Sequence, residues 1–475
     1  MNTSEMQAST PSQDHKLPTF EQWLNHAEQN MLYGILANIS PADGKPGAVV
    51  ASPSRSNPDY YYHWTRDSAR TMGEVVRLAQ THAFGMSAKF EQMMKDYIEF
   101  SVLNQQTPNP SGHVGEPKFY VDGDAYEEEW GRPQNDGPAQ RALTLTRWAH
   151  YCLSKGQTVD DLSLLYQANG GVIKTDLEFI AAHWQDCCFD VWEEVKGDHF
   201  YTRILQHVAL CEGAELAAKL GDEAAQGRYV EQAEAIKAAM AEFWCEDAGY
   251  YLATLNRNGG LDYKTSGLDI AVLLGVFQSL SASASYLTAT DDKVLATAYA
   301  LYQTFDSLFA VNKTRHSSHS ETLAPGIGRY PEDRYSGTDG VETGNPWFLC
   351  TGTMAGICYQ AALLFSEKQA LQVTRLNLPF LRLAMSYGES QCEINEGERY
   401  LMDSVGFRKV IHGLIGLGDA FLRRVQFHCG ENDSMSEQFH YQSGEMLSAG
   451  NLTWSYVNIL SCIGLKKQVS SLKDG

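Results

Sequence analysis

The segment from Cys188 to Thr202 brings an unusual set of side chains close together in the sequence. It reads C-F-D-V-W-E-E-V-K-G-D-H-F-Y-T and places Glu193 and Glu194 directly after Trp192. Solvated acidic runs usually lack aromatic residues, whereas a carboxyl group that packs against indole is desolvated and can act as an acid near neutral pH. The chemistry indicated is proton donation to a leaving oxygen. A structural role fits this segment equally well, with the tryptophan in the core and the glutamates capping a helix that begins near Phe200.

A second candidate site combines an arginine and an aspartate at a predicted helix start. The run N-P-D-Y-Y-Y-H-W-T-R-D ends on Arg66 and Asp67. Adjacent guanidinium and carboxylate groups can bind neighbouring hydroxyls of one polyol, with Tyr60 and Trp64 as an apolar floor. The alternative is that the aspartate caps the helix and the arginine forms a surface ion pair.

Other predicted loops hold further polar and aromatic residues. Trp130 lies in W-G-R-P, where it could contact a ligand or anchor the loop on the core. G-R-Y-P-E-D-R-Y and G-N-P-W-F-L-C supply Arg329, Tyr335 and Trp347. Glu437 lies among hydroxyl and amide side chains that can keep it ionised, although a lone glutamate in a polar loop is more commonly just solvated.

Helical periodicity dominates the chain that must position these residues. The predicted helices cover residues 20–39, 67–80, 85–103, 138–153, 174–184, 200–220, 222–244, 268–277, 292–309, 347–364, 369–385, 407–428 and 452–463. Thr19 and Gln22 predict a capping box at the first of them. A minor β-hairpin is predicted from residues 250–254 and 261–263 around Asn258-Gly259-Gly260.

The lengths of the connections predict how these helices are arranged. The links after the first, third, fifth, seventh, ninth and eleventh predicted helices are long, while those after the second, sixth and tenth are short. If successive helices alternate in direction, every long link emerges at one end of the molecule. We therefore expect an all-α toroid of six helix hairpins, with functional loops at one end. A single domain over residues 18–465 is expected, with a disordered tail at 1–17 and a C-terminal tail at 466–475.

Composition limits the class of partner. The net charge of -21 disfavours nucleic acid and anionic membranes, and 24 Tyr, 19 Phe and 9 Trp favour a neutral ligand such as a sugar. No stretch of about 18 apolar residues is expected to span a membrane. The ten cysteines form no C-x-x-C pair or cluster with histidine, so buried free thiols and no metal are expected. Residues 1–17 lack a signal-peptide core, which predicts a cytoplasmic protein unless an export signal has been removed.

Five of these motifs, taken together in their order along the chain, resemble those of the glucoamylases of glycoside hydrolase family 15. They are Y-Y-Y-H-W-T-R-D, G-E-P-K-F near W-G-R-P-Q-N-D-G-P, D-V-W-E-E-V, G-R-Y-P-E-D with G-N-P-W-F-L, and S-E-Q followed by L-T-W-S-Y. The resemblance runs from about Thr19 to about Leu460. It implies an (α/α)6 barrel, in agreement with the six hairpins, and no cofactor.

The resemblance also implies roles for individual residues. Glu193 would be the general acid and Glu437 the general base of an inverting, exo-acting hydrolase that releases β-D-glucose from maltooligosaccharides, starch or glycogen. The substrate-binding residues would be Tyr60, Arg66, Asp67, Trp130, Asp190, Trp192, Glu194, Arg329, Tyr335, Trp347 and Trp454, with Asp190 supporting the loop of the acid. Val191 and His63 depart from the residues common in the family, so fine specificity could differ.

Two alternatives remain open at this point. One is a non-hydrolytic glucan-binding or regulatory homologue, which should have lost one of the two carboxylates. The other is a hydrolase for a different linkage, such as trehalose or an α-1,6-glucan. A monomer is expected whichever function holds, the hydrolase included.

Overall fold

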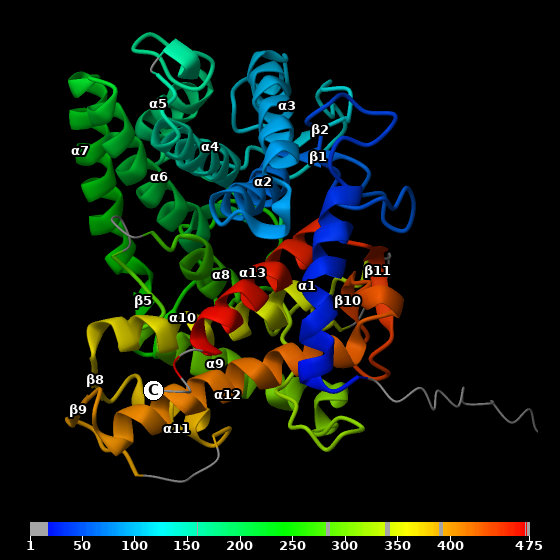
Figure 1. Cartoon of the computed structure of the whole chain (residues 1–475), viewed down its shortest axis with the longest axis vertical. Coiled ribbons are helices and arrows are strands. Elements are labelled where there is room, and N and C mark those ends of the chain that lie inside the picture. Colours follow the sequence, from blue (N-terminus) through cyan, green and yellow to red (C-terminus); the bar gives the residue numbers. More distant parts are fainter. Residues whose placement is uncertain are drawn as a thin grey trace, which may run out of the picture.

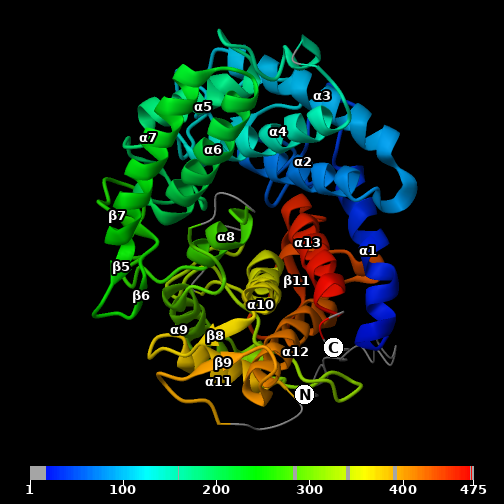
Figure 2. The ribbon, with the colours of Figure 1, turned by 60° about the vertical axis from the view of Figure 1, so that its left-hand side comes forward.

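The helices form two concentric rings around the centre of the molecule (Figures 1 and 2). The computed structural model describes residues 18–470 and 472, apart from 159, 282–285, 338–342 and 389–392. The inner ring consists of α2 (Thr65–Gln80), α4 (Asp136–Ser154), α6 (Phe200–Lys219), α8 (Ala271–Gln278), α10 (Phe348–Lys368) and α13 (Thr453–Ser470). Each inner helix contacts the next, and α13 contacts α2, which closes the ring.

Five of the outer helices pack on the inner helix that precedes them in the chain, and the first helix packs on the last. They are α1 (Phe20–Ala37), α3 (Ser87–Gln106), α5 (Val172–His183), α7 (Glu223–Ala239), α9 (Asp292–Leu308) and α12 (Val405–His428). A short extra helix, α11 (Leu378–Met385), lies between α9 and α12. The pairing confirms the predicted (α/α)6 barrel.

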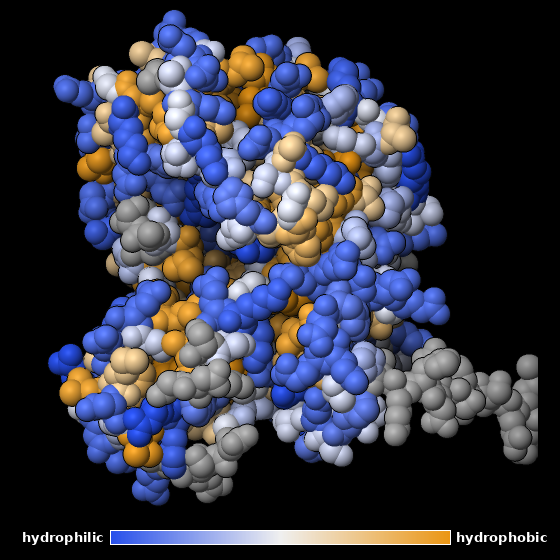
Figure 3. Space-filling model, viewed as in Figure 1, coloured by the Kyte–Doolittle hydropathy of each residue, from blue (hydrophilic) through white to orange (hydrophobic). Residues whose placement is uncertain are grey.

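Burial explains why the two rings differ in sequence. The inner helices α6 and α10 are buried on nearly all sides, whereas the outer helix α7 buries few of its residues. An apolar helix that is buried all round belongs in a core. In the space-filling view the surface is mainly hydrophilic and is hollowed across its middle (Figure 3).

The helix α10 corrects one expectation from composition. By length and hydropathy alone it could cross a membrane, although no such stretch was expected. Its most apolar window is 89% buried inside the protein. Its hydropathy therefore reflects its place in the inner ring.

Helix ends follow local sequence where capping residues are present. Thr19 accepts a hydrogen bond from the Gln22 amide and the Gln22 side chain accepts one from the Thr19 amide, which confirms the capping box. The last helix, α13, continues to Ser470, past the boundary expected at residue 465, and buries Lys466 and Val469. The expected tail at residues 1–17 lies outside the described residues.

Short antiparallel strands pair within and between the loops that connect the helices. The antiparallel pairs are β1 (His63–Trp64) with β2 (Lys118–Phe119), β3 (Cys188–Phe189) with β4 (Lys196–His199), β4 with β7 (Thr254–Leu255), β5 (Trp244–Cys245) with β6 (Tyr250–Tyr251), β8 (Ala370–Gln372) with β9 (Arg399–Leu401), and β10 (Ser436–Phe439) with β11 (Met446–Gly450). The hairpin predicted around Asn258 is wrong, because β6 pairs with β5 and β7 pairs with β4. The helix predicted over residues 369–385 is wrong in its first half, where β8 pairs with β9.

Candidate active site

A cavity of about 620 Å³ opens where the inner helices begin. Five of the six links predicted to be long lead into the starts of the inner helices α2, α4, α6, α8 and α10, and they gather at this end. The sixth, after the eleventh predicted helix, leads instead into the outer helix α12, and the link before α13 brings Glu437 to the cavity. The predicted site residues that line the cavity are Tyr60, Trp64, Arg66, Asp67, Trp130, Trp192, Glu193, Glu194, Arg329, Tyr335, Trp347, Glu437 and Trp454. Among the predicted set, Asp190 does not line it.

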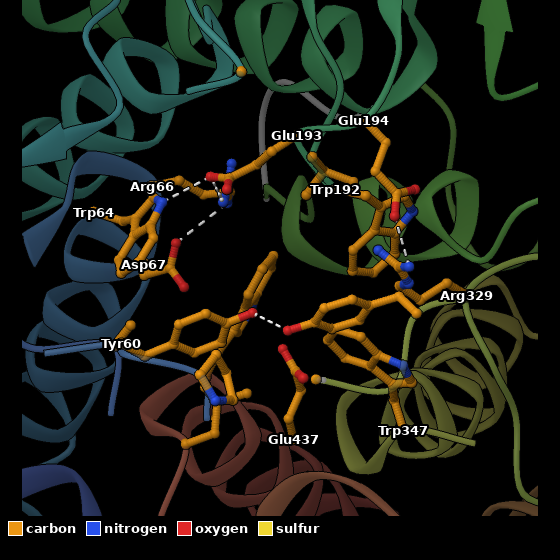
Figure 4. A pocket seen from close by; sticks show the side chains of 18 of the residues that line it. Tyr60, Trp64, Arg66, Asp67, Trp192, Glu193, Glu194, Arg329, Trp347 and Glu437 are labelled. Carbon is orange, nitrogen blue, oxygen red and sulfur yellow. Dashed lines mark hydrogen bonds and ion pairs between the residues drawn. The ribbon is translucent and has the colours of Figure 1, made fainter. Parts of the chain in front are cut away.

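Glu193 lies in the turn between β3 and β4, residues 190–195, which we call the acid loop. Its backbone has a φ of 67°, a left-handed conformation that is uncommon outside glycine and is concentrated at functional sites. One carboxylate oxygen, Oε1, accepts hydrogen bonds from Trp64 Nε1 at 2.7 Å and Gln134 Nε2 at 3.0 Å. Arg66 Nη2 lies 3.4 Å from the same oxygen. The predicted helix-capping role is wrong, because these contacts point Glu193 into the cavity (Figure 4).

Asp190 supports the acid loop, as the resemblance implied, although it does not line the cavity as the other predicted substrate-binding residues do. Its Oδ1 accepts hydrogen bonds from the backbone N–H of Glu194 at 2.7 Å and of Val195 at 3.1 Å. Burial alone would raise the pKa of Asp190, but Lys264 at 3.2 Å and these N–H groups hold the pKa below its usual value. An ionised Asp190 therefore fixes the loop backbone.

Trp192 is positioned differently from the expectation of a carboxyl packed on its ring. Its Nε1 donates to Asp269 at 3.0 Å, and Asp269 in turn pairs with Lys264 at 2.6 Å. The ring packs against Trp347 and Trp454 at centroid distances of 5.6 and 6.4 Å. Trp192 thus forms an aromatic wall, and the indole that hydrogen-bonds Glu193 is Trp64.

Glu437 lies on β10, on the other side of the cavity. Its Oε2 accepts hydrogen bonds from Ser448 Oγ at 2.5 Å and Gln438 Nε2 at 3.0 Å. Burial raises the pKa of Glu437 to about 7 in spite of these donors. Polar neighbours were expected to keep Glu437 ionised, but desolvation raises its pKa by more than they lower it, so Glu437 is mostly protonated below neutral pH.

Two tyrosines lie between the opposing carboxyl groups. The hydroxyls of Tyr60 and Tyr335 are 2.6 Å apart. Figure 4 shows Glu193 and Glu437 reaching the cavity from opposite sides of this pair, with open space between them. A substrate bound there would meet one carboxyl group on each side.

Arg66 and Asp67 begin α2 but do not cap it, since the N-cap residue is Trp64. Arg66 donates to Gln134 at 2.7 Å and to Asp136 at 3.2 Å. Arg66 Nε lies 3.3 Å from Asp67 Oδ2, yet neither atom has a hydrogen bond within the described chain. Burial raises the pKa of Asp67 to about 6. A buried donor and acceptor that make no hydrogen bond suit the hydroxyls of a polyol.

Arg329 links the acid loop to the loop before α10. It donates to Glu194 Oε1 at 2.7 Å and makes two bonds to Asp333, at 2.6 and 2.8 Å. Tyr330 donates to the other oxygen of Glu194 at 2.6 Å. Burial raises the pKa of Glu194 although Arg329 is so close. Glu194 is therefore fixed by protein contacts at the edge of the cavity.

An aromatic cage around Lys118 was not foreseen from the sequence. The Lys118 ammonium lies 3.6 Å from the ring centroid of Trp130, 3.9 Å from Tyr126, 4.0 Å from Tyr62 and 4.8 Å from Trp64. Trp130 and Trp64 also contact each other edge to face. Trp130 therefore both anchors its loop, through Lys118 and Trp64, and lines the cavity. The signal in the sequence was the lysine of G-E-P-K-F among so many loop aromatics, but no local pattern assigns it partners.

Gln134 and Ser448, which contact the two glutamates, were also missed. Among the described residues, His, Cys, Asp and Glu side chains form no group of three or more that could hold a metal ion. The nine described cysteines are free thiols, and Cys392 lies outside the described residues. The chemistry of the cavity is therefore argued from its carboxyl, hydroxyl, guanidinium and indole groups alone.

Comparisons with known proteins agree on one family. The model of "Glycosyl hydrolases family 15" matches residues 25–464. A glucoamylase of Blastobotrys adeninivorans is 35% identical over 92% of this chain and 70% of its own length, and a probable glucoamylase of Schizosaccharomyces pombe is 32% identical over 96% and 93%. The solved structure of a Saccharomycopsis fibuligera glucoamylase superposes with a TM-score of 0.85 at 29% identity, covering 97% of this chain and 98% of that one. The chain therefore belongs to glycosyl hydrolase family 15.

Proposed function

We propose that this protein is a glucan 1,4-α-glucosidase that removes β-D-glucose, one unit at a time, from the non-reducing ends of α-1,4-glucans and maltooligosaccharides. The observation that carries the proposal is that Glu193 and Glu437, far apart in the sequence, line one cavity from opposite sides (Figure 4). Relatives over more than nine tenths of the chain bear the name glucoamylase. We expect α-1,6 bonds to be cleaved more slowly.

The two carboxyl groups divide the chemistry of acetal hydrolysis. Glu193 protonates the departing glycosidic oxygen, and Glu437 takes a proton from a water molecule that attacks the anomeric carbon from the other face. Because that water must fit between Glu437 and the sugar, attack occurs directly and inverts the anomeric configuration. Glu437 must be ionised to act, so catalysis in the free enzyme strengthens as pH rises through about 7.

The remaining groups hold the terminal glucose. Asp67 Oδ2 and Arg66 Nε make no hydrogen bond within the described chain and offer an acceptor and a donor to neighbouring hydroxyls. Trp192, Trp347 and Trp454 give the sugar an apolar wall. Glu194 and Arg329 hold each other at the edge of the same cavity and set its shape.

Both alternatives are less well supported than the glucoamylase proposal. A non-hydrolytic homologue needs neither carboxyl group, yet both are present with dedicated hydrogen-bond donors. A preference for trehalose or an α-1,6-glucan is distinguished by comparing rates on maltose, isomaltose and trehalose. We expect maltose to be the fastest of the three.

The decisive experiment follows the anomer released from maltotriose by NMR. We expect β-glucose first, with the α-anomer appearing only by mutarotation. Glu193→Gln and Glu437→Gln should each lower kcat on the order of a hundredfold to ten-thousandfold with little change in maltose binding. Glu445→Gln, an exposed glutamate near β11, is the matched control and should keep full activity. Release of α-glucose, or loss of binding with unchanged kcat, would contradict the proposal.

A further inference from the structure

Lys264 is a buried lysine that lies close to the active site without lining it. It belongs to the segment between β7 and α8, and it is only 1% exposed. Lysines are almost never buried to this extent unless their charge is paired. A buried ammonium group destabilises the fold unless carboxylates compensate its charge and satisfy its hydrogen bonds. The partners of Lys264 therefore indicate which parts of the molecule its charge holds together.

Two aspartates from different loops compensate this charge. Lys264 Nζ lies 2.6 Å from Oδ2 of Asp269, which directly precedes the start of α8, and 3.2 Å from Oδ2 of Asp190 in the acid loop. Neither carboxylate has appreciable exposure. Burial alone would lower the pKa of Lys264, but Asp269, Asp190 and Glu194 raise it above its usual value. Lys264 is therefore charged, and one ammonium group serves two buried carboxylates.

Each of the two aspartates also holds a residue that neighbours Glu193 in the sequence. Asp190 Oδ1 accepts a hydrogen bond from the backbone N–H of Glu194 at 2.7 Å. Asp269 Oδ1 accepts one from Trp192 Nε1 at 3.0 Å. Trp192 and Glu194 lie together at one side of the cavity (Figure 4). The residues directly before and after Glu193 are thus both connected to the same lysine through one carboxylate each.

A third loop reaches the ammonium group through an aromatic ring. Lys264 Nζ lies 4.1 Å from the ring centroid of Tyr330, in the loop before α10, at a distance typical of a cation–π contact. The Tyr330 hydroxyl donates to Glu194 Oε2 at 2.6 Å. The backbone N–H of Leu261 donates to the Glu194 carbonyl at 2.9 Å, which keeps the segment of the lysine against the acid loop. The loops that lead into α6, α8 and α10 therefore meet at Lys264.

We propose that Lys264 is a positioning residue for Glu193, because its single charge holds the two aspartates that fix the residues on either side of that glutamate. This role rests on the proposed function, in which Glu193 protonates the leaving oxygen. Without the ammonium group, two buried carboxylates face each other, and one of them must take up a proton or move away. Either change weakens the restraint on Trp192 or Glu194. The nearby His199 cannot replace the charge, because burial lowers its pKa.

Lys264→Met removes the charge at similar side-chain length, and kinetics on maltotriose measure the effect. We expect kcat to fall on the order of a hundredfold, because the acid loop is misplaced. KM should change by less than about threefold, because Arg66 and Asp67 still hold the terminal glucose. The matched control is Lys466→Met, which removes a lysine that is also buried and lies 2.7 Å from Asp419, but does not line the cavity. It should lower the thermal midpoint and keep kcat; loss of kcat in both variants, or in neither, overturns the role of Lys264.

Amide hydrogen exchange of the acid loop gives a readout that needs no activity. In Lys264→Met, peptides that contain the amides of Glu194 and Val195 should exchange at least about tenfold faster than in the wild type. Lys466→Met should leave their exchange unchanged. If the wild type releases no glucose, the proposed function fails, and this experiment still decides the role of Lys264. Equal exchange in Lys264→Met and the wild type refutes that role.

The double variant Lys264→Met/Asp269→Asn separates the charge of the lysine from its packing. It leaves Asp190 as the single carboxylate, held by two backbone N–H groups, while the asparagine oxygen can still accept from Trp192. We expect the double variant to regain at least about tenfold of the kcat lost in Lys264→Met. A double variant that is no faster contradicts the proposal. If Lys264→Met is unfolded by circular dichroism, a folded double variant supports the role of the charge, and unfolding of both variants refutes it.

Discussion

At the scale of single residues, burial and hydrogen bonding compete at each carboxyl group of the active site. Glu437 is 2% exposed, and burial raises its pKa to about 7 although Ser448 and Gln438 donate to it. Asp190 is also buried, but Lys264 and two backbone N–H groups keep its pKa below the usual value. The difference is the full positive charge beside Asp190. A base whose pKa lies near neutrality can both accept a proton from water and release it afterwards.

The titration of Glu437 gives a pH prediction. Glu437 is the proposed base, so kcat/KM should rise as pH increases through about 7. Ser448→Ala removes a donor to the ionised form and should raise the pKa, moving this acidic limb upward by roughly 0.5 to 1 pH unit. The measurement is kcat/KM for maltose between pH 4 and 9. The control is Ser443→Ala, which changes an exposed serine of the same hairpin. If the acidic limb lies at the same pH in Ser448→Ala and in the wild type, Glu437 is not the base.

The cage around Lys118 gives a second prediction at this scale. Burial lowers the pKa of Lys118 to about 8, so its charge is lost as pH rises above that value. Loss of the charge removes the cation–π attraction to Trp64 and Trp130, and Trp64 hydrogen-bonds the proposed acid. Lys118→Met should therefore lower kcat/KM about tenfold at pH 6 and abolish a basic limb near pH 8. Lys313→Met, an exposed lysine, should change neither, and a basic limb that persists in Lys118→Met would exclude the cage as its origin.

At the scale of elements, close backbone approaches hold the acid loop. A Cβ at Gly131 would lie 2.6 Å from the Glu193 carbonyl oxygen, and one at Gly260 would lie 2.1 Å from that of Glu194. Neither position has room for a larger residue unless the loop moves. These two glycines therefore fix the loop against the segment before α4 and the segment that precedes α8.

Substitution of Gly131 tests this restraint. Gly131→Ala must push the Glu193 backbone aside, and a misplacement near 1 Å can lower kcat on the order of a hundredfold. Stability should change less than activity, because only a loop moves. The measurements are kcat on maltotriose and the thermal midpoint. The control is Gly227→Ala on the outer helix α7, where a Cβ meets no atom within 4 Å; it should keep kcat and slightly raise the thermal midpoint. Equal kcat in the two variants would show that the acid loop tolerates the methyl group.

Local patterns predict helices of this fold well and its strands poorly. The inner helix α6 was predicted from the spacing of its apolar residues, and the capping box from Thr19 and Gln22. Both signals lie within a few residues of each other in the sequence. The strands are two to five residues long, and β1 pairs His63 with Phe119 across a distant part of the chain. The hairpin predicted around Asn258 was wrong for this reason, since a turn signal does not identify the strand that will pair.

The site was predictable as far as residue types allow. Arg66 and Asp67 line the cavity from the first turn of α2, and Glu193 and Glu437 line it from the loops that lead into α6 and α13. Orientation could not be predicted, because Trp192 donates directly to Asp269, and Asp269 is paired with a lysine that no motif marks. The pKa of Glu437 depends on burial by the whole ring, which sequence neighbours do not reveal.

At the scale of the whole molecule, buried ion pairs join the inner ring to the outer ring. Arg141 of α4 makes two hydrogen bonds to Asp176 of α5, at 2.8 and 2.7 Å, and Gln105 of α3 donates to the same carboxylate at 2.8 Å. Neither charged side chain has appreciable exposure. By contrast, Asp306 and Arg315 form a pair near the surface.

Removal of one partner from each pair distinguishes a buried contact between the rings from a surface contact. Asp176→Ala leaves the Arg141 charge buried and unpaired, so it should lower the free energy of unfolding by about 3 to 5 kcal/mol. The matched control Asp306→Ala should lower it by about 1 kcal/mol or less, because solvent screens that pair. Urea unfolding at pH 7 measures both, and raised salt should change only the smaller effect. Asp176 does not line the active site, so the variant should keep its KM for maltose at low temperature. Equal losses in the two variants would mean that the hairpins stay together by apolar packing alone.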